Sequence, residues 1–204
     1  SGRTETVNEA RSAAPAPATT APAASTVDRR NKVAILPFSF TQDGQPAAPQ
    51  VSEEIQNECY ALLSKHAGVY NILSPRGTNV ALAKAGINSN NMLNYTMADL
   101  CQILGVEYVI EGMVTQNRTS QTNYGNTTYN EKEKDKNKDD KKSSGTSSSY
   151  STSTQNFQTV MDLKIYNDKS DIIYNQNRKA FWNTQDAYKN VLEYLIKRSP
   201  LYTK

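Results

Sequence analysis

Two short segments constrain the fold of this chain more than any other part of its sequence. Val33–Phe38 reads Val-Ala-Ile-Leu-Pro-Phe, an apolar run that suits a buried strand and includes a proline near its end. Leu104–Gly112 reads Leu-Gly-Val-Glu-Tyr-Val-Ile-Glu-Gly, a helix end at glycine followed directly by a β-branched strand. Together they predict an α/β domain, and neither contains a pattern typical of catalysis.

Apolar residues are unevenly distributed along the 204 residues. Residues 1–30 and 118–156 contain few of them, which leaves about 135 residues for one core, a common size for a single domain. We therefore expect a Pro/Ala/Thr tether over residues 1–30. We expect one α/β domain over residues 31–200, interrupted by a polar low-complexity insertion at 118–156.

The remaining segments alternate between strand and helix patterns. Helices between the first three strands, followed by an antiparallel hairpin, predict a mixed sheet of about five strands with helices packed on it and a C-terminal β-hairpin plus helix. The expected strands are 33–38, 69–73, 106–115, 157–167 and 172–181, and the expected helix N-caps are Ser52, Ser74, Thr96 and Thr184.

The fourth expected strand has two different faces. Met161, Leu163 and Ile165 alternate with Asp162 and Lys164, so one face of the sheet should be covered and the other wetter. The hairpin turn at 167–170 follows it and lacks the usual glycine.

The insertion is polar throughout. Its centre, Glu131–Lys142, holds six lysines against five acids, and its flanks are rich in Ser, Thr, Asn and Gln. Neither flank offers the alternating apolar face that a membrane-inserting hairpin needs. The composition favours a disordered loop. The alternative is a polar arm that extends the sheet and contacts a partner through its tyrosines, namely Tyr124, Tyr129 and Tyr150.

The chain offers little for chemistry. It has one histidine, His66, no Gly-rich phosphate loop and no cluster of metal-ligand residues, so we expect no enzyme, cofactor or metal. Cys59 and Cys101 lie in different expected helices; free buried thiols are favoured over a disulfide between them. Acids interleave with the basic residues at a net charge of +3, which argues against nucleic-acid binding.

The N-terminal segment indicates how the domain is held. Residues 13–25 form a Pro/Ala/Thr run that stays extended and solvated. Such tethers follow the lipid-modified cysteine of bacterial lipoproteins, and the alternative is a frayed terminus after a cloning scar. The longest uninterrupted apolar run, Val33–Phe38, is far shorter than the ~20 residues of a membrane helix, so we expect membrane attachment only through a lipid.

The strand ending at Pro37–Phe38, the segment Leu104–Gly112 and the strand Met161–Tyr166 together resemble one group of bacterial envelope proteins. The group comprises the N-terminal domain of TolB, the curli-secretion lipoprotein CsgG and the penicillin-binding-protein activator LpoB. The resemblance covers residues 32–197 and implies a periplasmic, outer-membrane-anchored module. A module of this kind docks on and regulates or positions another envelope protein, such as a peptidoglycan synthase. The alternative is a protomer of a homo-oligomeric secretion assembly of the CsgG kind, without lipid-facing hairpins.

A second candidate contact surface lies on the last expected helix. Tyr194 and Arg198 would be exposed there, beside the end of the chain. The simpler interpretation, which we prefer for this helix, is an ordinary solvated helix end whose cationic side chains suit the negative end of the helix dipole.

Overall fold

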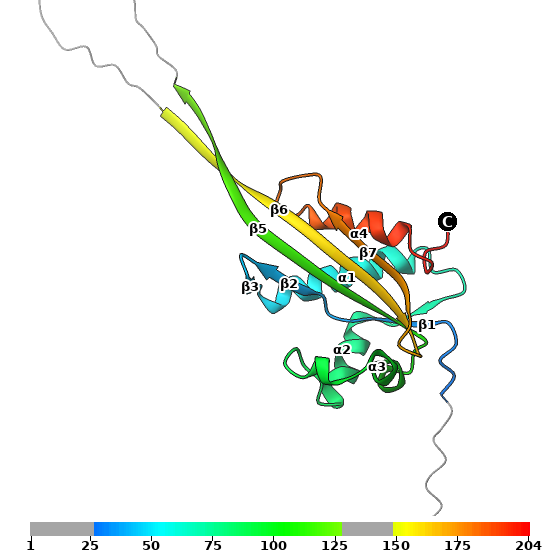
Figure 1. Ribbon diagram of the computed structural model, residues 1–204. Helices are drawn as coiled ribbons and strands as arrows, with labels where there is room; N and C mark the ends of the chain where they lie inside the picture. Colours follow the sequence, from blue (N-terminus) through cyan, green and yellow to red (C-terminus); the bar gives the residue numbers. More distant parts are fainter. Residues whose placement is uncertain (1–26, 128–148) are drawn as a thin grey trace, which may run out of the picture.

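A computed structural model describes residues 27–127 and 149–204. It confirms the expected fold class, a mixed β-sheet with helices packed on it (Figure 1). The elements in chain order are β1 (Lys32–Ile35), β2 (Ser39–Gln42), β3 (Gln45–Pro46), α1 (Pro49–Ser64), β4 (Asn71–Ile72), α2 (Pro75–Lys84), a 3₁₀ turn (Met92–Asn94), α3 (Met97–Leu104), β5 (Tyr108–Thr127), β6 (Ser149–Asn167), β7 (Ile172–Lys179) and α4 (Tyr188–Lys197).

Strand β5 organises the sheet. One of its edges pairs first with β1 and then, after Pro37, with β2, and both pairings are parallel. Its other edge pairs with β6, and β6 pairs with β7, both antiparallel. Strand β4 extends the sheet beyond β1, and the short β3 folds back on β2. Because β1 and β2 share one edge of β5, the sheet is about five strand positions wide, as expected.

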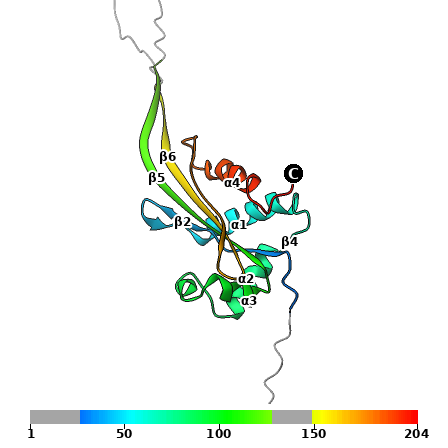
Figure 2. The ribbon, with the colours of Figure 1, turned by 45° about the vertical axis from the view of Figure 1, so that its right-hand side comes forward.

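Helices α1 and α4 lie side by side on one face of this sheet (Figure 2). They bury the main core against the alternate residues of the strands, so the predicted alternation in β6 is confirmed. The members of this core include Ile35, Ile55, Leu63, Ile110, Val114, Met161, Leu163, Ile165, Leu192 and Ile196.

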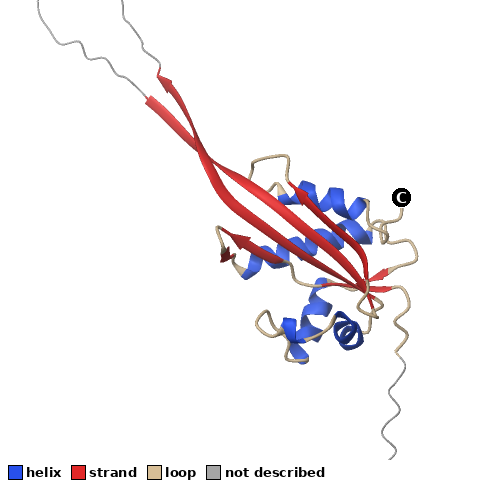
Figure 3. Cartoon of the chain, in the orientation of Figure 1, coloured by secondary structure: helices blue, strands red, loops and turns tan. Residues whose placement is uncertain are grey.

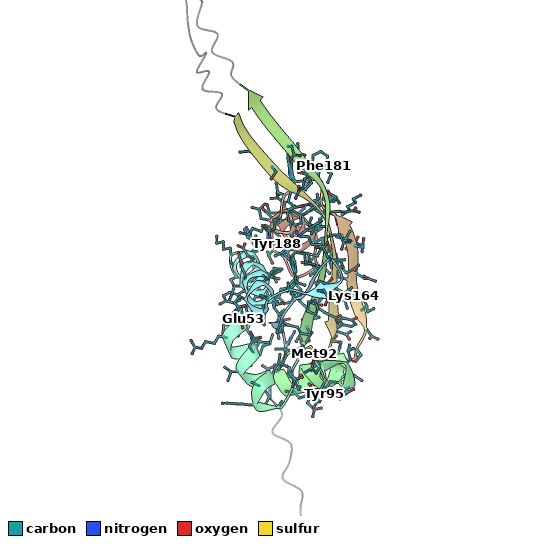
Figure 4. The ribbon with its side chains drawn as sticks, turned by 90° about the vertical axis from the view of Figure 1, so that its left-hand side faces the viewer. Glu53, Met92, Tyr95, Lys164, Phe181 and Tyr188 are labelled. Atoms are coloured by element: carbon teal, nitrogen blue, oxygen red, sulfur yellow. The ribbon has the colours of Figure 1, made fainter. Side chains whose placement is uncertain are left out.

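The other face is only partly covered. Helices α2 and α3 bury a second, smaller core against β1 and the start of β5, with Leu36, Leu100 and Val109 among its members. Farther along the strands this face is open, and Lys164 lies on the side away from Glu53 in α1 (Figure 4). Within residues 27–127 and 149–204, every helix is too short or too polar to span a membrane.

Two of the four expected helix caps are confirmed. Ser74 accepts a hydrogen bond from Gly77 N, and Thr96 forms a capping box with Asp99. Ser52 is wrong as a cap, because α1 already begins at Pro49, whose fixed φ and missing N–H suit the first helical position. Thr184 is also wrong, since α4 begins at Tyr188 after a turn in which Thr184 O accepts from Ala187 N.

The largest difference from expectation concerns strand length. Strand β5 continues to Thr127 rather than ending at Thr115, and β6 begins at Ser149 rather than at Phe157. The interpretation of the whole insertion as a disordered loop is therefore wrong for 118–127 and 149–156, which form a β-ladder. Residues 128–148 lie outside the described residues, so their part of that interpretation stays a prediction.

Candidate functional site

The most prominent surface feature is the part of the β5–β6 strand pair that extends beyond the other strands of the sheet (Figure 3). Residues 119–127 of β5 and 149–156 of β6, called here the arm, pair only with each other among the described residues. The pairing of β2 with β5 ends at Gln116 of β5, and the pairing of β7 with β6 ends at Val160 of β6. At about 3.3 Å per residue, the β5 side of the arm extends roughly 30 Å beyond the sheet.

The base of the arm is fixed on one side by the turn between β2 and β3. Asp43 and Gly44 both have positive φ, 52° and 78°, as a two-residue hairpin turn requires. The Asp43 carboxylate accepts from Arg118 N at 2.8 Å and lies 3.5 Å from Arg118 Nε. Asp43 N donates in turn to Gln116 O at 2.9 Å. The turn therefore holds β5 at the point where it leaves the sheet.

A register shift between Arg118 and Gln121 marks the start of the arm, and side-chain amides bridge it. Asn156 Nδ2 donates to Ser120 Oγ at 3.1 Å and to Thr122 Oγ1 at 2.8 Å. Gln121 Nε2 donates to Gln155 Oε1 at 3.3 Å across the two strands. A two-stranded ribbon has little stability by itself, and these hydrogen bonds link its two strands where the register of the ladder shifts.

The three tyrosines predicted as anchors fall where little can be described. The backbone of Tyr124 pairs with Thr152, and that of Tyr150 pairs with Asn126, so both belong to the arm. Their side chains lie outside the described parts of the structure, as does the whole of Tyr129. Their role as partner contacts stays a prediction.

The two predicted residues of the last helix are brought together. The Tyr194 ring lies between two guanidinium groups, with Arg178 Cζ 3.3 Å and Arg198 Cζ 3.4 Å from the ring centroid. Two groups this close to one centroid must occupy opposite faces of the ring. The stack therefore joins β7 to α4 through cation–π contacts, and Arg198 Nη1 also donates to Tyr194 O at 3.2 Å.

The sequence analysis missed Arg178 and its role in this stack. Arg178 shares the α4 face of β7 with Gln176 and Tyr174, and the Tyr174 hydroxyl donates to Leu195 O at 2.8 Å. The sequence shows which residues share this face of the strand. It does not show that Arg178 stacks on Tyr194, which lies sixteen residues farther along the chain in α4.

A second missed feature is an exposed aromatic pair after β7. Phe181 is 87% and Trp182 59% exposed, and their rings meet edge to face with centroids 5.2 Å apart. Asn183 O accepts from Phe157 N at 2.9 Å, which places the pair at the base of the arm (Figure 4). Two consecutive large aromatics at a strand end cannot both face one core, and that was a usable signal.

A shallow cleft of about 630 Å³ lies between the β2–β3 turn and the beginnings of α1 and α4. The buried Gln116 at its floor donates to Thr159 Oγ1 at 3.1 Å and to Gln185 O at 2.8 Å, and accepts from Gln42 Nε2 at 3.1 Å. Burial, with Glu54 nearby, raises the pKa of Tyr188 in the cleft wall to about 12. The polar atoms of Gln116 therefore have partners within the protein, so its burial is explained by the fold.

The two cysteines are free and lie in different cores. Cys59 packs between α1 and the sheet, whereas Cys101 packs under α3 on the opposite face. The sheet separates them, so the disulfide alternative is wrong. Burial raises the pKa of both thiols, that of Cys101 to about 11 with a further contribution from Asp168.

His66 lies beyond the end of α1, where its ring stacks on Tyr202 and its Nδ1 lies 3.1 Å from Thr203 O. These contacts fasten the C-terminal tail to α1. In the parts of the chain that the structure describes, no three acidic, histidine or cysteine side chains gather as a metal site would require.

No family model matches the chain, and a search of curated proteins found no match. Similar solved structures include the LpoB C-terminal domain from Salmonella enterica, at 11% identity and a TM-score of 0.40, covering 76% of this chain and 85% of that one. Another is the lipoprotein GNA1162 from Neisseria meningitidis, at 11% identity and a TM-score of 0.47, covering 79% and 91% of the two chains.

Proposed function

We propose that this chain is a non-catalytic interaction module of the bacterial cell envelope. Its N-terminal tether holds it at the outer membrane, and its arm docks on another envelope protein that it regulates or positions. The arm is the observation that carries this proposal. A ribbon about 30 Å long buries no apolar core of its own, so its clearest physical use is to present a surface far from the folded body.

The position of the arm supports this use. Val27, the first described residue, lies beside Gly105, three residues before β5 begins, because a Cβ built on Gly105 would lie 3.5 Å from Val27 Cγ1. The arm is at the other end of β5 (Figure 1). A tether that reaches the domain at Val27 would therefore leave the arm pointing away from its anchor, toward a partner.

The fixed base supports it further. The hydrogen bonds of Asp43 to Arg118 N and of Asn156 to Thr122 hold the two strands at the base of the arm in one direction. Pre-ordering a contact element lowers the entropy lost on binding. The sequence resemblance to LpoB makes a peptidoglycan synthase the first partner to test.

The test is capture by photo-crosslinking. A photoreactive amino acid is placed at Gln121 or Asn123 in the arm, and at the exposed Asn57 of α1 as a matched control. The full chain is expressed in a Gram-negative envelope, irradiated and recovered. We expect the arm positions to give a discrete adduct with another envelope protein and the Asn57 position to give none.

A deletion variant completes the test. Residues 120–154 are replaced by Asn-Gly, which suits a short hairpin turn. We expect unchanged folding by circular dichroism and loss of the captured protein. An unchanged capture pattern in this variant would overturn the proposal. A light-scattering mass equal to many copies of the chain, with arm adducts only between copies, would instead favour the assembly of the CsgG kind.

A further inference from the structure

The outer edge of the sheet, formed by β7, is open. Among the described residues β7 pairs only with β6. Ala180 N donates to Thr159 O at 2.8 Å, and antiparallel ladders alternate between bonded and non-bonded pairs. It follows that Lys179, Asn177 and Asn175 sit in non-bonded positions and direct their backbone N–H and C=O groups to the free edge.

This edge lacks most of the features that keep edge strands from pairing with strands of other chains. The segment Tyr174–Lys179 contains no proline, and the register irregularity of β7 is confined to its beginning, near Tyr166 of β6. Asn175 and Asn177 at its centre are uncharged. Exposed apolar side chains mark both ends of the edge, Ile172 and Ile173 at its start and Phe181 and Trp182 just beyond it.

The flank of this edge is positively charged. Arg178 and Arg198 stack on opposite faces of the Tyr194 ring, and Lys179 follows on β7. Within the described ranges neither guanidinium lies in an ion pair. Of the nearby carboxylates, Glu193 pairs with Lys197, whereas Asp162 accepts from Asn177 Nδ2 and lies on the opposite face of the sheet from Arg178.

We infer that the β7 edge is a strand-addition site for an extended acidic segment of a partner protein. The incoming strand pairs with the free backbone groups of Asn175, Asn177 and Lys179. Its carboxylates, at alternate positions, meet the guanidinium groups of Arg178 and Arg198 in charge-assisted hydrogen bonds. The exposed aromatics at Phe181 and Trp182 contact an apolar residue at one end of the segment.

Charge decides between this occupant and a second copy of the chain. A second β7 would bring another Arg178 and Lys179 to an edge where, among the described residues, Arg178 and Arg198 already lie in no ion pair. An acidic strand would neutralise this positive charge. The site is distinct from the arm, so it adds a second contact to the proposed docking function and does not depend on it.

The test uses the full chain and a synthetic peptide probe in which Glu alternates with Val over seven residues. Matched peptides carry Gln or Lys in place of Glu. Binding is followed by fluorescence anisotropy and by amide hydrogen exchange. We expect the Glu peptide to bind about tenfold more tightly than the Gln peptide, to weaken with salt, and to slow exchange at Asn175, Asn177 and Lys179.

Two variants separate backbone pairing from charge. Asn175→Pro removes one outward N–H without touching the bonds to β6, and Asn175→Val is its matched control. We expect about tenfold weaker binding for the proline variant than for the valine variant. The double variant Arg178→Gln/Arg198→Gln should lose about tenfold for the Glu peptide and nothing for the Gln peptide. Should the proline variant fail to fold, the exchange protection and the arginine variant decide.

The inference is overturned by any of three results. These are no binding of the Glu peptide up to about 1 mM, equal binding by the double arginine variant, or concentration-dependent self-association through β7. The deletion of residues 120–154 must leave peptide binding intact. Failure of the arm experiment therefore does not affect this site, and failure here does not affect the arm.

Discussion

Ser170, in the turn between β6 and β7, has a φ of 64°, in the left-handed region that favours glycine. Its Oγ accepts from Ala98 N, in the first turn of α3, at 2.8 Å. The backbone conformation costs roughly 1 kcal/mol, and the hydrogen bond offsets about the same amount. We predict that Ser170→Gly changes the free energy of unfolding by less than about 0.5 kcal/mol, whereas Ser170→Ala lowers it by about 1 kcal/mol. Urea denaturation measures both, and equal losses would contradict the account.

Tyr188 gives the protein a pH dependence above neutrality. Burial raises its pKa from 10.0 to about 12. Between these values the unfolded chain releases a proton that the folded chain keeps. The stability contributed by the neutral Tyr188 hydroxyl is therefore fully present below pH 10 and is lost as the pH rises through 12. We predict that Tyr188→Phe reduces the slope of the unfolding free energy between pH 10 and 11.5. Denaturant titrations across this range measure the slope, and an identical slope would show that the hydroxyl ionises freely in the native state.

Residue-scale features were predictable where they depend on neighbours in sequence. The Ser74 cap and the Thr96 capping box were predicted because both need only a helix start and a partner three residues on. Ser52 failed because Pro49 is an equally good local start three residues earlier. Thr184 failed because α4 begins four residues later, at Tyr188, whose ring packs edge to face against Phe40 from the other end of the chain.

At the scale of elements, β5 depends on one glycine. Gly112 is buried opposite Leu163, and a Cβ at this position would overlap the Phe38 ring. Gly125, in the arm, has open space at the same point. We predict that Gly112→Ala lowers the free energy of unfolding by about 2 kcal/mol, because Phe38 must leave its position. Gly125→Ala should change it by less than about 0.5 kcal/mol. Thermal and urea unfolding compare the pair, and a tolerated Gly112→Ala would show that Phe38 moves freely.

The sequence predicted the elements of the core better than the arm. Strands inside the sheet carry an alternating apolar signal, such as Met161, Leu163 and Ile165. The arm has none, because its ladder is supported by backbone pairing and by amides such as Asn156. Polar residues with β-favourable side chains fit both a loop and a ribbon, so composition alone could not separate these two interpretations.

At the scale of the molecule, the candidate surfaces come from residues far apart in the chain. Arg178, Tyr194 and Arg198 form one stack from two elements, and the edge of β7 is open because no other strand of the described residues pairs with it. Neither arrangement has a local sequence signature. The periodicity of a strand shows which face is buried, but it does not show which neighbour is missing.

The distance between the tether end and the arm end of the molecule can be measured directly. Val27 lies beside Gly105, just before β5 begins at Tyr108, and Gly125 lies seventeen residues beyond Tyr108 on that strand. At about 3.3 Å per residue these ends are separated by roughly 55 Å. Cys59 and Cys101 are buried with raised pKa values, so a nitroxide reagent should label only introduced cysteines.

We predict a narrow distribution near 55 Å between spin labels at Val27→Cys and Gly125→Cys in double electron–electron resonance. The control pair Val27→Cys and Met113→Cys should give about 20 Å, because Met113 is exposed on β5 close to its start. A broad distribution, or one well below 40 Å, would mean that the arm folds back on the body. The arm could then no longer present its surface away from a tether at Val27, and the proposed division between an anchored end and a docking end would fail.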